Sequence, residues 1–163
     1  MQLERNTIAY SGQLSMSKEK CFKETEKFIF YRGLGDFRTK LLTTSGQGEL
    51  AFENRGTDEI PAIFLVYTDE KQSGTVLPLG SLAQGGKLSV TQAQIQALKN
   101  NLAEQKEFIT QARDVLLSAI TNAGLYTDEA RAMIDTWENG YFKTPGLRVL
   151  YVLGQHEVEE ILP

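Results

Sequence analysis

The chain has 163 residues, 41% of them hydrophobic and 23% charged, with a formal net charge of −4 at pH 7. This is the composition of an ordinary globular protein, and it provides no positive field that would collect nucleic acid or an anionic membrane surface. Cys21 is the single cysteine, which excludes an intrachain disulfide and a cysteine-based zinc site. No apolar run is long enough to cross a bilayer, and the N-terminal residues lack the basic and apolar regions of a signal peptide.

We expect a single domain over residues 1–163, built from four consecutive segments. These are a polar, irregular N-terminal segment (1–27), a β meander (28–90), a helical segment (91–139) and returning strands (146–163). In the first segment a short strand is expected near Thr7–Tyr10, followed by loop or helix. The chain ends on EEILP without a polar tail, which favours a domain taken from a longer protein.

Short apolar runs separated by turn residues predict the antiparallel meander. The runs are FIFYRG, KLLTT, GELAFEN, IPAIFLVYT, TVLPLGSL and KLSV. Polar and apolar residues alternate in GELAFEN, which is typical of a strand with one wet face, whereas AIFLVY is apolar on both faces and is expected at the centre of a sheet. The turn at 46–48 is expected to join KLLTT to GELAFEN.

From Thr91 onward the apolar period becomes helical. Thr91 and Gln94 form a capping-box pattern, and one long helix, broken or bent, is expected to end at Gly124. Its apolar seam consists of Ile95, Leu98, Leu102, Ile109, Ala112, Leu116 and Ala119. Such a seam packs against an antiparallel helix of the same chain, or else binds a protein partner or a second copy of the chain.

A second helix is expected from Thr127, the predicted N-cap, to Gly140. Ala130, Met133, Ile134 and Trp137 form its apolar stripe, and Arg131 and Asp135 have the spacing of a surface ion pair. The strand LRVLYVL follows. The predicted fold class is therefore α+β: an antiparallel β-sandwich-like meander with a helical hairpin inserted before the last strands.

The sequence contains few residues that point to a specific chemistry. His156 is the single histidine, which excludes two-histidine zinc motifs, and its setting in GQHEVEE favours a solvated turn. Gly33 and Gly35 lack the third glycine and the helix of a dinucleotide fingerprint. The lysines near Cys21 favour either a reactive thiol or, more simply, an exposed segment. The acids expected in loops, which are Asp36, Asp58, Asp69 and Glu70, lack EF-hand spacing, so no metal and no cofactor is expected.

Glu129 is the most interesting acid. It lies near the edge of the apolar stripe, where partial burial would raise the pKa of a carboxyl group, although its position also suits stabilisation of the helix dipole. Arg32 and Arg148 each interrupt an apolar strand, and a buried arginine requires a carboxylate partner. A Glu129–Arg148 or Glu129–Arg32 pair is therefore the sharpest structural hypothesis.

Three islands of sequence, FYRGLG at 30–35, GLYTDEARAMIDTW at 124–137 and GLRVLY at 146–151, resemble an uncharacterised family of bacterial envelope-associated proteins, many of them exported or lipid-anchored. The resemblance covers residues 28–163. It implies a periplasmic or envelope location, but no activity and no functional residues.

Two functions follow as expectations. The first is a noncatalytic envelope module that binds a protein partner or a second copy through the long helix, without nucleic acid and without a transmembrane segment. The second is a hydrolase-type enzyme whose site contains Glu129, Arg32 and Arg148.

Overall fold

The computed structural model describes residues 3–5, 24–26, 39–46 and 48–161. The chain divides into two compact units, Met1–Gly35 and Asp36–Pro163. In the first unit β1 (Leu3–Arg5) pairs antiparallel with β2 (Glu24–Glu26). Loop or helix was expected at the position of β2. The expectations for Thr7–Tyr10, Cys21, the run at 28–33, the Gly33–Gly35 pair and Asp36 lie outside the described residues.

The second unit contains six strands, four α-helices and one short π-helix within its described part. Their bounds are β3 (Leu41–Gly46), β4 (Glu49–Asn54), β5 (Ile60–Thr68), β6 (Gly74–Leu82), β7 (Lys87–Thr91), α1 (Gln92–Asn100), α2 (Gln105–Asn122), α3 (Thr127–Glu138), η1 (Asn139–Lys143), β8 (Gly146–Val152) and α4 (Gln155–Ile161).

The strands of this unit form two antiparallel sheets with the orders β3-β4-β7 and β6-β5-β8. The predicted turn between β3 and β4 is confirmed, since these strands pair with Gly46 opposite Glu49. The central position of β5 is also confirmed. Its residues Ile63 and Leu65 belong to one apolar cluster, and Phe64 and Val66 to another on the opposite face.

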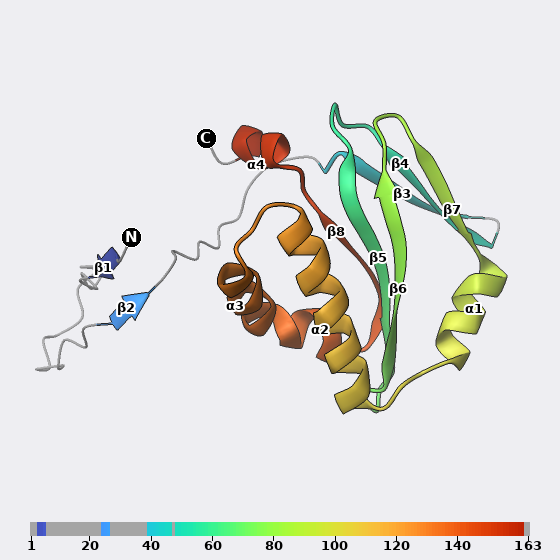
Figure 1. Cartoon of the computed structure of the whole chain (residues 1–163). Coiled ribbons are helices and arrows are strands. Elements are labelled where there is room, and N and C mark those ends of the chain that lie inside the picture. The colour runs from blue at the N-terminus through green and yellow to red at the C-terminus, as the bar shows by residue number, and fades with distance from the viewer. Residues whose placement is uncertain (1–2, 6–23, 27–38, 47, 162–163) are drawn as a thin grey trace, which may run out of the picture. The chain divides into compact units, whose positions relative to one another are not determined.

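Each face of the β6-β5-β8 sheet is covered by a different layer. The first apolar cluster also contains residues of β3, β4, β7 and α1, and the second contains residues of α2, α3 and η1. Figure 1 shows these two layers on opposite sides of β5 and β6. The α+β class is therefore confirmed. A single meander is not observed, because β4 pairs with β7 while the hairpin between them, β5 and β6, pairs with β8.

The long helix predicted from Thr91 is broken between Asn100 and Gln105. Its capping box is confirmed: the Gln94 amide donates to Thr91 Oγ1, and the Thr91 amide donates to Gln94 Oε1. At the break the Gly74 amide donates to the Ala103 carbonyl at 3.0 Å, and the Ala103 amide donates back at 2.9 Å. Because the edge of β6 occupies these backbone groups, the helical ladder cannot pass through Ala103.

The break divides the predicted seam between the two cores. Ile95 and Leu98 are buried in the first cluster, and Ala112 and Leu116 in the second. The middle of the seam, Leu102, lies in the connection and is partly exposed. Most of the seam is therefore covered by the chain itself.

The end of α2 has the predicted glycine cap. Gly124 has a φ of +111°, its amide donates to the Thr121 carbonyl, and the Leu125 amide donates to the Ile120 carbonyl. This pair of bonds is the Schellman motif. The predicted start of the next helix is one residue off, since Tyr126, not Thr127, is the N-cap.

Two further predictions for the second helix are wrong. Gly140 does not end it, because the backbone continues as η1 to Lys143. Asp135 does not pair with Arg131; it accepts a hydrogen bond from Arg113 of α2, which also donates to Glu138 at 2.6 Å. A partner on a packed neighbouring helix has displaced the local i,i+4 pair.

The C-terminal segment also differs from its prediction. Only β8 returns to the sheet, and the residues after Gly154 form α4 instead of a strand or turn. His156 therefore lies on a helix, although its side chain is solvent-exposed as expected.

Candidate functional site

Glu129 acts in the structure as a helix cap. Its Oε2 accepts a hydrogen bond from the Tyr126 amide at 3.2 Å, three residues earlier, and the residue is partly buried. A glutamate at the third helical position commonly satisfies the first free N–H group in this way. The observed contact of this carboxylate is thus structural.

Arg148 is bound by neutral oxygens. Its guanidinium donates to the carbonyls of Tyr141, Thr144 and Pro145 and to Thr68 Oγ1. Thr68 is itself buried and donates to the Phe142 carbonyl at 2.9 Å. Arginine at such a position satisfies the free carbonyls at a helix end. Burial lowers the pKa of Arg148 from its ordinary value.

Of the three candidate residues the structure describes two, Glu129 and Arg148. Within the described chain Glu129 and Arg148 form no ion pair with each other, and Arg32 lies outside it. The Glu129–Arg148 pairing is therefore not observed, because backbone groups nearby satisfy both side chains first.

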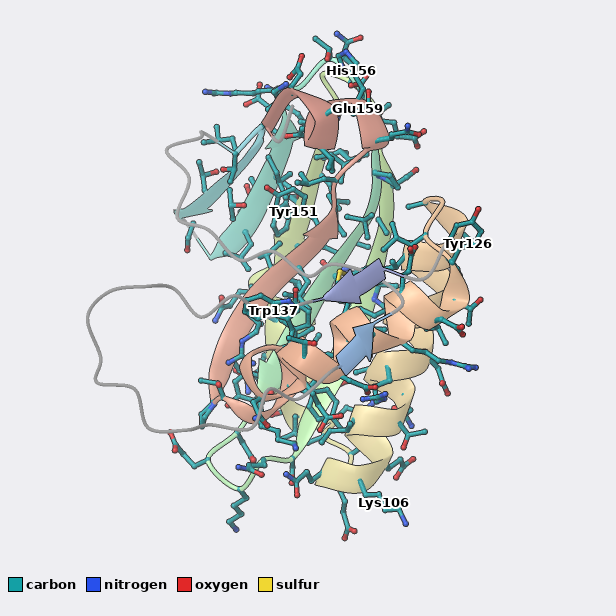
Figure 2. The ribbon with its side chains drawn as sticks, turned by 90° about the vertical axis from the view of Figure 1, so that its left-hand side faces the viewer. Lys106, Tyr126, Trp137, Tyr151, His156 and Glu159 are labelled. Carbon is teal, nitrogen blue, oxygen red and sulfur yellow. The ribbon has the colours of Figure 1, made fainter. Side chains whose placement is uncertain are left out.

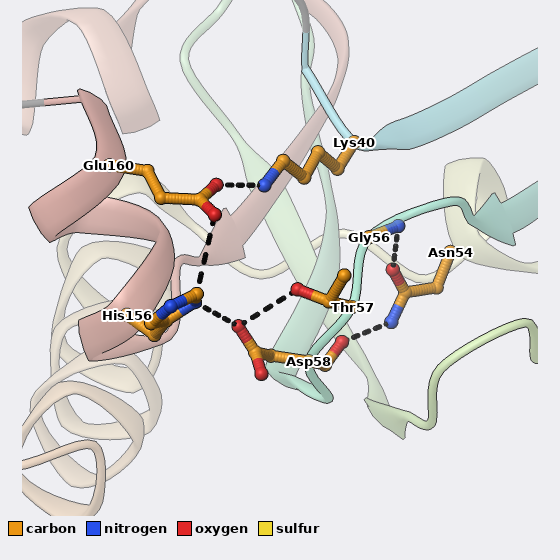
Figure 3. Close-up of polar contacts among 7 residues, drawn as sticks. All are labelled: Lys40, Asn54, Gly56, Thr57, Asp58, His156 and Glu160. Atoms are coloured by element: carbon orange, nitrogen blue, oxygen red, sulfur yellow. Dashed lines mark hydrogen bonds and ion pairs between the residues drawn. The ribbon is translucent and has the colours of Figure 1, made fainter.

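A different group of charged residues meets beside α4, and we call it the α4 cluster: Lys40, Asp58, His156 and Glu160 (Figure 3). Lys40 Nζ is bonded to Glu160, and His156 Nδ1 lies 3.0 Å from Asp58 Oδ2 and 3.9 Å from Glu160 Oε1. Lys40 directly precedes β3, Asp58 lies in the loop after β4, and His156 and Glu160 lie on α4. His156 and Asp58 each attract attention in the sequence, but no local signal shows that residues 98 positions apart are in contact.

The loop that carries Asp58 is held by Asn54, which is 1% exposed. The Asn54 amide donates to the carbonyls of Asp58, Leu82 and Ala83, and its Oδ1 accepts from the Gly56 amide at 2.9 Å. A buried amide with all these contacts fixes the loop strongly. Asp58 therefore faces His156 from a well-supported position.

The chemistry of the α4 cluster is that of a surface ion-pair network. The His156 side chain is 64% exposed and that of Asp58 43%. The contact with Glu160 raises the pKa of Lys40, and Lys40 lowers the pKa of Glu160. An aspartate that orients a histidine is also found in catalytic triads, but the hydrogen bonds of this cluster lead to Thr57 and to no serine or cysteine in the described chain. The geometry supports attachment of α4 better than catalysis.

A groove lies between α2 and the strands β5 and β6, and we call it the α2 groove. Its volume is about 510 Å³. Ala62, Gly80, Ser118 and Ala119 are among the small residues on its walls. Phe64, which is 4% exposed, also lines it. A Cβ placed on Gly80 would meet no atom within 4 Å.

The groove exists because small residues face each other. The other contacts of α2 with the sheet are filled by large side chains, such as Phe108 and Phe142, whose rings pack edge to face. Toward the end of α2, alanine and serine face alanine and glycine, so the two elements cannot fill the space between them. The groove therefore combines apolar walls with polar groups such as Glu59, Ser118 and Asn122, and a concave surface of mixed character offers a place for a ligand.

A second hollow, of about 470 Å³, lies on the outer face of the β3-β4-β7 sheet. Its acid, Glu53, already pairs with Arg55 at 3.3 Å and with Lys87 at 4.0 Å. In the α2 groove the acid is Glu59, whose carboxylate forms no ion pair with any described residue. The α2 groove is therefore the better candidate for a charged partner.

The described residues contain no group of three or more histidine, cysteine or acidic side chains placed to hold a metal ion. No helix in that part of the chain has the length and apolarity needed to cross a membrane. Figure 2 shows that Lys106 at the start of α2 and His156 on α4 lie at opposite ends of the view.

Comparison with known proteins gives no further guide to the site. No family model matches the chain, and no curated protein or solved structure is significantly similar to it.

Proposed function

We propose that the protein is a noncatalytic interaction module that binds an extended segment of a partner protein in the α2 groove. The observation that carries the proposal is the groove itself, an open site with apolar and polar groups on its walls, beside an acid that forms no ion pair with any described residue. The matching partner has bulky apolar side chains that fill the space over Phe64, next to a lysine or arginine that meets Glu59. Binding through the helix seam is less favoured, because the chain itself covers most of the seam.

The helix α2, which forms one wall of the α2 groove, packs against α3. We propose that α2 and α3 work as a helical hairpin, since Arg113 joins α2 to Asp135 and Glu138 of α3. The apolar cluster shared by the two three-stranded sheets likewise supports a sandwich-like packing. Rigid walls reduce the conformational entropy that a partner must overcome on binding.

An envelope location stays a proposal from the resemblance of the three sequence islands. The enzyme alternative has no comparable support, because Glu129 and Arg148 both bond to nearby backbone groups.

A random peptide library displayed on phage tests the proposal. Peptides selected on the wild-type protein are compared for binding to Ser118→Arg, which fills the groove from an exposed wall position. The matched control is Gln111→Arg, on the same face of α2 two turns earlier and also exposed. We expect peptides that combine bulky apolar and basic residues, with a loss of roughly tenfold or more on Ser118→Arg and none on the control.

Glu59→Gln tests the charge requirement separately. It should weaken the binding of each selected peptide in proportion to how much the affinity of that peptide depends on a basic residue. Selected peptides that bind Ser118→Arg as well as wild type, or a library that yields no enriched peptide, would overturn the proposal.

A further inference from the structure

The described side chains of α4, at 155–160, contact the rest of the unit mainly through polar groups. Of its side chains described at 155–160, only Glu157 is buried, at 6% exposed, and Val158 is 39% exposed. Neither apolar cluster includes any of these side chains. An element with little apolar burial belongs to the least stable part of a fold.

The contacts that hold α4 are those of the α4 cluster (Figure 3). Glu160 bonds to Lys40, and His156 contacts Asp58 at 3.0 Å. The Glu157 charge acts on Lys40 and on Tyr151 of β8, whose pKa is raised by burial and by that charge. Glu159 bonds within the helix, to Gln155. Ion pairs that face solvent are weak and are screened by salt.

The same contacts lead to the end of the α2 groove. Asp58 is followed directly by Glu59, which lines the groove. Gly154, just before α4, lies beside this point, since a Cβ on it would make an ordinary van der Waals contact, 3.6 Å, with the Glu59 carbonyl oxygen. The position of α4 therefore bears on the loop that carries Glu59.

We infer that α4 is a detachable strap: it separates from the unit without global unfolding, and its separation releases the contact of His156 with the Asp58 side chain, next to Glu59 at the end of the α2 groove. A basic side chain of a partner that reaches Glu59 also competes with Lys40 and His156 for their acids. The part of this inference that concerns a bound partner rests on the proposed function.

The contact between Lys40 and Glu160 responds to ionic competition and not to a change of pH near neutrality. The Lys40–Glu160 contact raises the pKa of Lys40 above its ordinary 10.5 and lowers that of Glu160 below 4.5. The contact therefore stabilises the attached state fully between these two values. It is lost only as the pH falls through the lowered pKa of Glu160 or rises through the raised pKa of Lys40.

Amide hydrogen exchange followed by NMR tests the strap without any ligand. The reporter is the Val158 amide, which donates to the Gly154 carbonyl at 3.1 Å. The Leu65 amide of the central strand reports global unfolding. In Lys40→Gln/Asp58→Asn, or in 1 M salt, we expect exchange at Val158 to rise roughly fivefold or more with no change at Leu65.

Two variants separate the strap from a general effect of charge. Lys87→Gln removes another surface cation, which pairs with Glu53 at 4.0 Å, and should leave the exchange rate at Val158 unchanged. Lys40→Arg keeps the positive charge and should keep exchange at Val158 as slow as in wild type. The inference is overturned if Val158 exchanges at the rate of Leu65 in every sample, or if salt and the double substitution leave it unchanged. Since no peptide is present, these outcomes are independent of the library experiment.

Discussion

Among the described glycines, Gly74 is the one at which an added Cβ would come nearest to another atom. It begins β6, is buried, and pairs through its backbone with Ala103 at the break between α1 and α2. A Cβ added there would lie 2.5 Å from Phe108 Cε1 and 2.6 Å from Cδ1. Carbon atoms in contact are normally about 3.5–4.0 Å apart, so Gly74→Ala requires the Phe108 ring to move by about 1 Å.

The ring has little room to move. Phe108 is 0% exposed, and its ring centroid lies 6.0 Å from that of Phe142, edge to face. Overpacking of a filled core costs about 1–3 kcal/mol, and the lower entropy of the unfolded alanine variant returns about 0.4–1 kcal/mol. We expect Gly74→Ala to lose about 1–2 kcal/mol of unfolding free energy net.

Urea unfolding followed by circular dichroism measures the loss. The matched control is Gly46→Ala, since a Cβ there meets nothing within 4 Å and the residue has an ordinary φ. It should leave the unfolding free energy unchanged or raise it, by at most about 1 kcal/mol. Phe108→Leu in the Gly74→Ala background should be less costly than in wild type, because the two sites share one space. A Gly74→Ala protein as stable as its control would refute the close approach of β6 to α2.

Two further predictions concern polar groups. Asn54→Ala removes the donor for the Leu82 and Asp58 carbonyls and should cost about 2–4 kcal/mol in urea unfolding, since a buried group left without a partner is expensive. Glu138→Gln weakens the contacts with Lys143 and Arg113 and should cost about 1 kcal/mol at pH 7. Because Lys143 and then Arg113 lower the pKa of Glu138, this difference is present above its ordinary 4.5 and disappears as the pH falls through the lowered value.

Asn54→Ala and Glu138→Gln each have a control substitution at an exposed position. Asn100→Ala, at an exposed position, should change the unfolding free energy by less than about 0.5 kcal/mol. If Asn54→Ala changed it by no more than Asn100→Ala does, Asn54 would not be the residue that supports the loop. Asp114→Asn, on the exposed side of α2, should leave the acid limb of the stability profile as in wild type. A Glu138→Gln protein with the same acid limb as wild type would show that the contacts of Glu138 contribute no pH dependence.

The candidate site was only partly accessible to sequence reasoning. Arg148 stands out in the sequence because it interrupts an apolar strand, and Glu129 because it lies at the edge of the apolar stripe of its helix. Their partners are carbonyl and amide groups, which every residue carries, so no pattern of side chains predicts these contacts. The α4 cluster has the opposite difficulty: its members are ordinary surface charges, and only the fold places Asp58 beside His156.

The sequence by itself determined the elements whose signals are local. The alternation of GELAFEN, the apolar run of β5, the Thr91–Gln94 capping box and the glycine that ends α2 all depend on residues within a few positions of each other. Tertiary structure alone decided where the long helix breaks, which partner Asp135 takes, and that small residues of α2 and β6 leave a groove between them. Those outcomes depend on which backbone edge or side chain is nearby in space, and that becomes defined only when the layers pack.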